Sequence, residues 1–330
     1  MPMHKVNLFL YLISWASGIA GAWIICTFGV KLRLMDIPTT RSSHRQITPK
    51  GGGVGILVAF FISALFLSVS TSLWIPAVFI SLLSIYADRH EISPTLRLIL
   101  HFSASFAFLI SLKGTYPSDQ MIDYGAIILL SFFIVGTANV YNFMDGIDGI
   151  AGITGIVGFG LLALYAHLSG SNPVLVSLCL SIIASCIGFL YFNFPKARVF
   201  MGDVGSILLG FVFSALVILM SKNIFDFICL TCFLFPFYAD ELNTMILRIR
   251  NGENLTQPHR KHFYQILANE YNIPHWKISI GYGFAQLMIG SGIIYFKKMG
   301  FIAIALIITI SYLCFVLLFY KAVAKPELTQ

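Results

Sequence analysis

Long apolar stretches constrain this 330-residue chain more than any other feature. Eleven of them are candidate membrane spans, since a helix needs roughly 20 residues to cross a hydrocarbon core about 30 Å thick, although 74–87 and 98–112 are shorter than this. Backbone polar groups in lipid must be satisfied within the segment, so each stretch should be a helix. We expect the spans at 7–30, 52–70, 74–87, 98–112, 124–140, 150–168, 174–192, 206–221, 227–247, 277–296 and 301–320. The sequence therefore predicts an all-α polytopic membrane bundle of about 10–11 helices, forming one domain over 1–330.

The composition excludes an ordinary soluble domain. Only 11% of the residues are charged and 58% are apolar, whereas soluble domains carry about 25% charged residues. The net charge of +7 is better explained by membrane orientation than by nucleic-acid binding, because no basic soluble domain is present. Sixteen of the 21 Lys and Arg residues lie in alternate loops or after the last span. We therefore expect the N-terminus outside and cytosolic loops at 31–50, 88–97, 141–149, 193–205 and 248–276.

Most of the carboxylates lie in or beside these expected cytosolic loops. Asp88, Asp145, Asp148 and Asp203 each stand at the end of an apolar stretch. A carboxylate near membrane depth costs on the order of 2.5–3.5 kcal/mol on insertion scales. One reading is that these are solvated loop charges, and the local sequence favours a second reading, in which they form a site.

Two short sequence motifs indicate that these carboxylates form a site. In residues 139–149, Asn139, Asn142, Asp145 and Asp148 recur every three residues, so a continuing helix would place them along one side. In residues 200–206, Asp203 stands between two glycines at the start of a span, where a helix N-terminus favours phosphate. Hard oxygen ligands beside a phosphate site are what Mg²⁺ requires. The runs predict a Mg²⁺ site, with Mn²⁺ as the alternative ion.

Two further loops add basic groups to the same face. Residues 41–53 include Arg41 and His44 before a triglycine, and residues 258–265 include His259, Arg260 and His262. Cations and imidazoles together favour binding of a pyrophosphate. Zinc is the poorer alternative, because the two loop histidines have no third ligand at a suitable spacing. The six cysteines lie in apolar stretches, where we expect them to pack as small apolar residues.

These motifs resemble those of the polyprenyl-phosphate N-acetylhexosamine-1-phosphate transferase superfamily. Residues 139–149 are similar to its N-x-x-N-x-x-D-G-x-D-G motif, and residues 192–210 to its F-M-G-D-x-G-S region. The start of the 41–53 loop and the 258–265 loop resemble the O-antigen-initiating branch. The resemblance implies a bacterial inner-membrane enzyme that transfers a sugar-1-phosphate from a UDP-N-acetylhexosamine (GlcNAc, FucNAc or QuiNAc) to undecaprenyl phosphate, releasing UMP. Membrane lipids are expected partners and nucleic acid is not, and a homodimer is left open.

The resemblance also implies roles for individual residues. Asp203 would be the main Mg²⁺ ligand, with Asp88 and Asp145 as further ligands, and Phe200 would stack on uracil. The catalytic group would consist of Asp88, Asp145, Asp148 and Asp203. Contacts with the substrates are expected from Asn139, Asn142, Phe200, Arg97, His259, Arg260, His262, Arg41 and His44.

One position departs from the family pattern. Where the family has paired aspartates after the third span, this chain has Ala87 and Asp88. A phosphate monoester is mostly dianionic at neutral pH and needs little help from a base, so we expect activity with Asp88 alone. Two other functions stay open on the sequence. They are a catalytically impaired paralogue that binds a nucleotide sugar, and a transporter or lipid flippase, which would favour paired halves and charges near the midplane.

Overall fold

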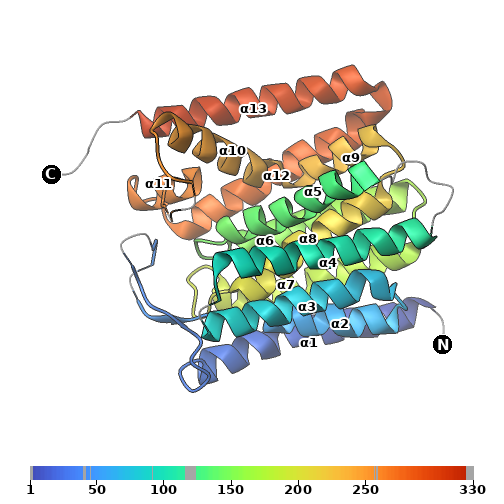
Figure 1. The fold of residues 1–330 in the computed structure, drawn as a ribbon, viewed down its shortest axis with the longest axis horizontal. Coiled ribbons are helices and arrows are strands. Elements are labelled where there is room, and N and C mark those ends of the chain that lie inside the picture. Colours follow the sequence, from blue (N-terminus) through green and yellow to red (C-terminus); the bar gives the residue numbers. More distant parts are fainter. Residues whose placement is uncertain are drawn as a thin grey trace.

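The computed structural model describes residues 3–39, 42–44, 46–90, 92–115, 124–255, 257 and 259–324. Its helices lie side by side in one bundle, and Figure 1 shows their long axes running in similar directions. The elements are α1 (Met3–Phe28), β1 (Met35–Asp36), β2 (Thr48–Pro49), α2 (Val54–Phe66), α3 (Thr71–Arg89), α4 (Pro94–Thr115), α5 (Tyr124–Phe143), α6 (Ile150–Leu168), α7 (Pro173–Asn193), α8 (Asp203–Met220), α9 (Ile224–Thr231), η1 (Cys232–Leu234), α10 (Phe235–Arg250), α11 (Phe263–Asn269), α12 (His275–Phe296), η2 (Lys297–Met299) and α13 (Phe301–Val323).

The all-α membrane fold expected from the sequence is confirmed. Within the described ranges, nine helices are long and apolar enough to cross a membrane. The expected spans 74–87 and 98–112 extend in both directions as α3 and α4. The expected span 52–70 is represented by α2, which has 13 residues. Helix α8 is apolar on all sides and nearly all of its residues are buried, as expected for a helix enclosed by others.

The expected continuous span 227–247 is wrong in its detail. The segment is broken into α9, the 3-10 turn η1 and α10. Pro236 lies in the first turn of α10, where its missing N–H and fixed φ are tolerated. A proline deeper inside an unbroken helix would lose a hydrogen bond and clash with the preceding turn. We therefore attribute the break to Pro236, whose effect on the backbone is not visible in the pattern of apolar residues.

One end of the bundle, here called the site face, carries the loops at 31–50, 88–97, 141–149, 193–205 and 248–276. In Figure 1 this is the left end, where the loop that includes β1 and β2 lies near α11. Strands β1 and β2 pair antiparallel, with Asp36 opposite Thr48. The chain then runs directly into the triglycine 51–53 and α2. The site face is therefore built from segments that are far apart in the sequence.

The triglycine binds a second segment of the site face. The N–H groups of Gly51 and Gly52 donate to the carbonyl of Phe200, at 3.1 and 2.9 Å, and Gly53 N–H donates to Met201 O at 2.9 Å. The Cα of Gly205 would lie only 2.6 Å from a Cβ on Gly53, so no side chain fits there. The glycines thus allow close packing against residues 199–205, and their N–H groups are used in these backbone hydrogen bonds.

Candidate active site

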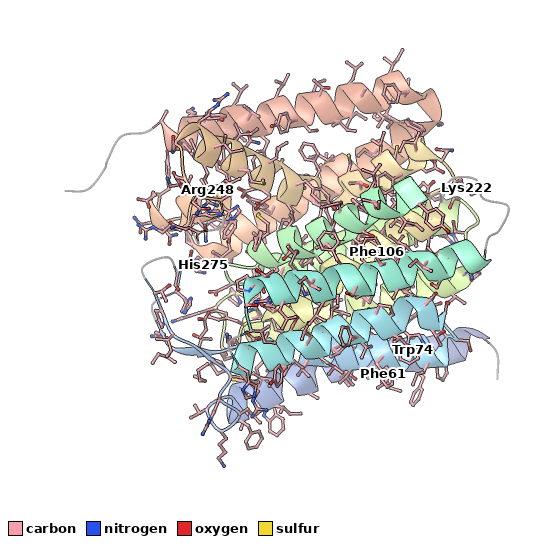
Figure 2. The ribbon with its side chains drawn as sticks, viewed as in Figure 1. Phe61, Trp74, Phe106, Lys222, Arg248 and His275 are labelled. Carbon is pink, nitrogen blue, oxygen red and sulfur yellow. The ribbon has the colours of Figure 1, made fainter. Side chains whose placement is uncertain are left out.

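A polar cavity of about 860 Å³ opens among the loops of the site face. Its size lies within the range of about 300–1,000 Å³ that is usual for small-molecule sites. Every loop of the site face contributes a charged or imidazole side chain to the lining of this cavity. These side chains belong to Asp36, His44, Lys50, Asp88, Arg97, Asp145, Asp203, Glu241, Arg248, His259 and His262. Figure 2 shows Arg248 and His275 at this end of the bundle and Lys222 at the opposite end.

Asp203 faces the cavity and contacts two other helices. It begins α8, and its Oδ1 accepts a hydrogen bond of 2.8 Å from Asn142 Nδ2 at the end of α5. Its Oδ2 forms an ion pair with the guanidinium of Arg97 from α4. The same Asn142 amide donates to Ser206 Oγ at 2.9 Å. Three of the residues predicted from separate motifs are therefore in direct contact.

Asp88 faces the cavity from the end of α3 beside Lys50. Lys50 Nζ lies 2.8 Å from Asp88 Oδ1, and the aspartate side chain is only 8% exposed. Asp88 Oδ2 has no hydrogen-bond partner among the described residues. Burial opposes the charged form of Lys50, but the hydrogen bond to Asp88 and the charge of Asp203 outweigh it and raise the pKa of Lys50. Lys50 therefore stays cationic beside the site.

Asp145 and Asp148 do not share one side of a helix, because the helical continuation assumed from their spacing is wrong. Helix α5 ends at Phe143, and α6 begins only at Ile150 after Gly149 in the left-handed region, with φ +83°. Asp145 lines the cavity, and burial, followed by the charges of Asp203 and Asp148, raises its pKa well above its ordinary range.

Asp148 is engaged with α12. Its Oδ2 lies 3.2 Å from His275 Nδ1, and its backbone carbonyl accepts a hydrogen bond of 2.7 Å from Ser279 Oγ. Among the described residues that line the cavity, Asp148 is not included. The structure therefore gives Asp148 a contact with α12 and leaves its expected catalytic role a prediction.

Of the other residues expected to contact the substrates, some line the cavity and others do not. Phe200 and His44 line the cavity with their rings packed edge to face, 4.8 Å apart between centroids. Asn139 also lines it, although its side-chain amide donates to Val135 O of its own helix. Arg260 extends away toward Glu270, at 3.8 Å, and does not belong to the described lining. Arg41 lies outside the described residues.

The two loop histidines both reach the cavity, in different environments. His262 is almost completely buried at the start of α11, and His259 packs 4.8 Å from it, centroid to centroid. Burial, followed by the electrostatic influence of His262 and Arg248, lowers the pKa of His259 to about 4. His259 is therefore neutral at physiological pH and can accept a hydrogen bond.

Several lining residues were missed by the sequence reasoning. Lys50 lies in the 41–53 loop, and a cation directly before a triglycine was a usable signal. Glu241 lies within the expected span 227–247, and nothing in the sequence pairs it with the histidine loop. Arg248 was counted only as an orientation charge. Its guanidinium donates to the carbonyls of Asn254, Leu255 and Gln257 and so holds the loop after α10 in place.

The oxygen donors in the cavity suit Mg²⁺. Asp88, Asp145 and Asp203 line the same space with hard carboxylate ligands. In the part of the chain that the structure describes, no group of three His, Cys, Asp or Glu side chains converges closely enough to hold a metal ion alone. Mg²⁺ usually binds through one or two carboxylates, several waters and the substrate's phosphates. These residues fit an ion that the substrate helps to bind.

Comparison with known proteins gives a consistent result. Residues 70–221 match the sequence model described as glycosyl transferase family 4. The chain is 27% identical over 259 residues to a probable undecaprenyl-phosphate N-acetylglucosaminyl 1-phosphate transferase of Bacillus subtilis, covering 74% of this chain and 72% of the relative.

Two further relatives extend the comparison. The undecaprenyl-phosphate alpha-N-acetylglucosaminyl 1-phosphate transferase of Thermotoga maritima is 28% identical over 258 residues, or 77% of this chain and 79% of the relative. The phospho-N-acetylmuramoyl-pentapeptide-transferase of Vesicomyosocius okutanii is 33% identical over 223 residues, or 55% and 62%. With the motif residues gathered around Asp203, these matches support the resemblance of the chain to the polyprenyl-phosphate N-acetylhexosamine-1-phosphate transferase superfamily.

Proposed function

We propose that this protein transfers N-acetylhexosamine-1-phosphate from a UDP-sugar to undecaprenyl phosphate and releases UMP. The lipid-linked sugar would begin an O-antigen or another cell-envelope polysaccharide of a bacterium. The observation that carries the proposal is the contact of Asp203 with Arg97 and Asn142 inside a cavity lined by Lys50 and His259. Relatives whose names state this chemistry support it.

The proposed reaction is one phosphoryl transfer. An oxygen of the lipid phosphate forms a bond to the β-phosphorus of the UDP-sugar. The bond from that phosphorus to the oxygen bridging the two donor phosphates breaks, and UMP leaves with the electron pair. The lipid phosphate is mostly dianionic at neutral pH, so no proton need be removed from it. Positioning and charge neutralisation then account for most of the catalysis.

The residues of the chain supply that positioning. Lys50 and Arg97 offset negative charge on the phosphates, and Asp88 holds the ammonium group of Lys50 at the cavity wall. Neutral His259 can accept a hydrogen bond from a sugar hydroxyl. Mg²⁺ held by Asp203, Asp145 and Asp88 would neutralise further charge on the diphosphate when bound. Ala87 is absent from the described lining of the cavity, which supports activity with Asp88 alone.

A second, apolar cavity supports a lipid substrate. It measures about 410 Å³ and is lined mainly by apolar side chains of α1, α2 and α3. Asp88 and Gly51 border this cavity, and Asp88 also borders the polar one. A lipid phosphate needs an apolar surface next to a polar, cationic one, and the two cavities provide both at Asp88.

The test is formation of product by the full-length protein in detergent with undecaprenyl phosphate and Mg²⁺. Radiolabelled UDP-GlcNAc, UDP-FucNAc, UDP-QuiNAc and UDP-MurNAc-pentapeptide would each be supplied, and label in butanol-extractable lipid would be measured together with UMP. The Asp203→Asn variant should lower turnover by about 100-fold or more, the scale of one lost preorganised electrostatic contact. Glu270→Gln is the control, because this exposed carboxylate on the same face lies outside the described lining.

The outcomes separate the proposed functions. Labelled lipid from one UDP-N-acetylhexosamine supports the transferase and names its sugar. UDP-sugar binding with no labelled lipid from any donor would indicate the impaired paralogue. When the same protein is reconstituted into vesicles, label that crosses the membrane without joining a lipid would indicate a transporter. Near-normal turnover by Asp203→Asn would contradict the role of Asp203.

A further inference from the structure

The segment that carries His259 and His262 is connected to the bundle through a buried carboxylate on α10. Asp240 is completely buried and lies one residue before Glu241. Glu241 lines the polar cavity, whereas Asp240 is not among the described residues that line it. Asp240 therefore faces the histidine segment without touching the space where substrates would bind.

Asp240 accepts hydrogen bonds at both carboxylate oxygens. Its Oδ1 accepts from the backbone N–H of Phe263 at 2.7 Å and from Thr244 Oγ1 at 3.2 Å. Its Oδ2 accepts from the hydroxyl of Tyr282 at 2.6 Å and from the N–H of Tyr264 at 3.3 Å. A carboxylate has about four acceptor sites, so this one is fully used. Such saturation is what makes a buried charge tolerable.

The same carboxylate faces His262. Asp240 Oδ1 lies 3.5 Å from His262 Nδ1, and Glu241 Oε2 lies 3.7 Å from His262 Nε2. The imidazole thus lies between two consecutive carboxylates of α10. On its other side it stacks on the ring of Tyr264, with 5.5 Å between centroids and 14° between planes. These contacts enclose the ring between α10 and Tyr264.

The anchored segment also reaches the 139–149 motif. The hydroxyl of Tyr264 donates to Phe143 O at 3.0 Å, at the end of α5. Gly146 leaves the space for this hydroxyl, since a Cβ at that position would overlap it. A shift of the segment would therefore move the histidines and disturb the backbone beside Asp145.

We propose that Asp240 is a positioning residue that holds the His259–Tyr264 segment against the cavity and so sets the affinity for the UDP-sugar donor. This inference rests on the proposed function, in which the two histidines contact the donor. Asp240 acts through the segment and does not itself touch the substrate. The effect should therefore fall on the donor and spare the lipid acceptor.

The test compares steady-state kinetics of Asp240→Asn and wild-type protein with each substrate varied in turn. The carboxamide keeps the size of the side chain but replaces one acceptor oxygen with an NH₂ group, so one buried donor loses its partner. We expect kcat/KM for the UDP-sugar to fall about tenfold, the equivalent of one buried hydrogen bond. The KM for undecaprenyl phosphate should change by less than about twofold.

A buried polar residue on the same helix provides the matched control. Asn243 is also buried, and its amide donates to Ala239 O of its own helix, at 2.7 Å. Asn243→Ala should lower thermal stability without a specific effect on the donor. If Asp240→Asn lowered stability and changed both KM values in the same way as Asn243→Ala, the role would be merely structural and the proposal would be overturned.

A double-mutant cycle tests the route of the effect. If Asp240 acts through the histidine segment, Asp240→Asn should add little to the donor defect of His262→Ala, because residues that act as a unit are not additive. Fully additive effects would contradict the proposal.

Hydrogen exchange gives a readout that needs no turnover. The amides of Phe263 and Tyr264 should exchange faster in Asp240→Asn than in wild-type protein or Asn243→Ala. Unchanged exchange at both amides would overturn the anchoring itself. If these amides exchanged faster in Asp240→Asn but the wild-type protein made no labelled lipid, the anchoring would stand and the proposed function would be wrong.

Discussion

Replacing Gly53 with alanine should reduce activity, although the residue lies outside the described lining of the polar cavity. A Cβ at position 53 would lie 2.6 Å from the Cα and 2.8 Å from the nitrogen of Gly205. Non-bonded carbon atoms prefer about 3.5–4.0 Å, so the two backbones would have to separate by about 1 Å. Both contacts are backbone atoms, and no side-chain rotation can relieve them.

That separation would move two parts of the polar cavity. Residue 205 lies in the first turn of α8, two residues after Asp203, and Gly53 follows Lys50 by three residues. Overpacking of this kind costs about 1–3 kcal/mol in stability. A misplacement of about 1 Å at a catalytic constellation can cost about 100-fold in rate. We therefore expect a modest loss of thermal stability and a much larger loss of turnover.

The assay measures UMP release and the apparent Tm of detergent-solubilised Gly53→Ala. Gly281→Ala is the matched control, because a Cβ on this exposed helical glycine of α12 would meet nothing within 4 Å. The control should keep its turnover and gain a few tenths of a kcal/mol in stability from better helix propensity. If Gly53→Ala behaved like the control, close packing of the triglycine against α8 would not be what holds Asp203 and Lys50 in register.

Two further predictions concern single side chains at the site face. Asp88→Asn should lower turnover by about 100-fold, whereas Ala87→Asp should change it by less than about threefold, and equal effects in the UMP-release assay would contradict the assignment. His259 has its pKa lowered from 6.5 to about 4 by burial, then by His262 and Arg248. Its neutral form therefore contributes stability above pH 6.5 that is lost as the pH falls toward about 4. His259→Asn should flatten the fall of apparent Tm over that window, and an unchanged slope would refute the attribution.

The helical bundle could be predicted from the sequence because a lipid bilayer restricts the secondary structure that a spanning segment can form. A long apolar stretch must form a helix, so composition and length locate most spans without knowledge of their neighbours. The broken segment at 227–247 escaped because Pro236 changes the backbone without changing the apolar pattern. The co-location of Asn142, Arg97 and Asp203 was also predictable, because all three stand at the ends of spans that reach the same face.

The contacts within the site were less predictable, because they depend on loops that return from distant parts of the chain. Asp148 follows the spacing of Asn142 and Asp145, but that spacing matters only if the helix continues. The chain instead leaves the helix after Phe143, and Asp148 turns to His275 on α12. Arg260 belongs to the same short motif as His262 and yet extends to Glu270. A motif fixes which residues are near one another in sequence, and the backbone between them decides which enter the cavity.

The pairing of charges explains how such a site can exist at the end of an apolar bundle. Lys50 pairs with Asp88 and Arg97 with Asp203, so each pair brings little net charge to the edge of the membrane. Removing one partner leaves the other uncompensated in a partly buried site, which costs more than the pair itself contributes. A single substitution at either pair therefore mixes lost catalysis with a newly unpaired charge. Removing both members of a pair avoids the unpaired charge, and comparison of single and double variants separates the two effects.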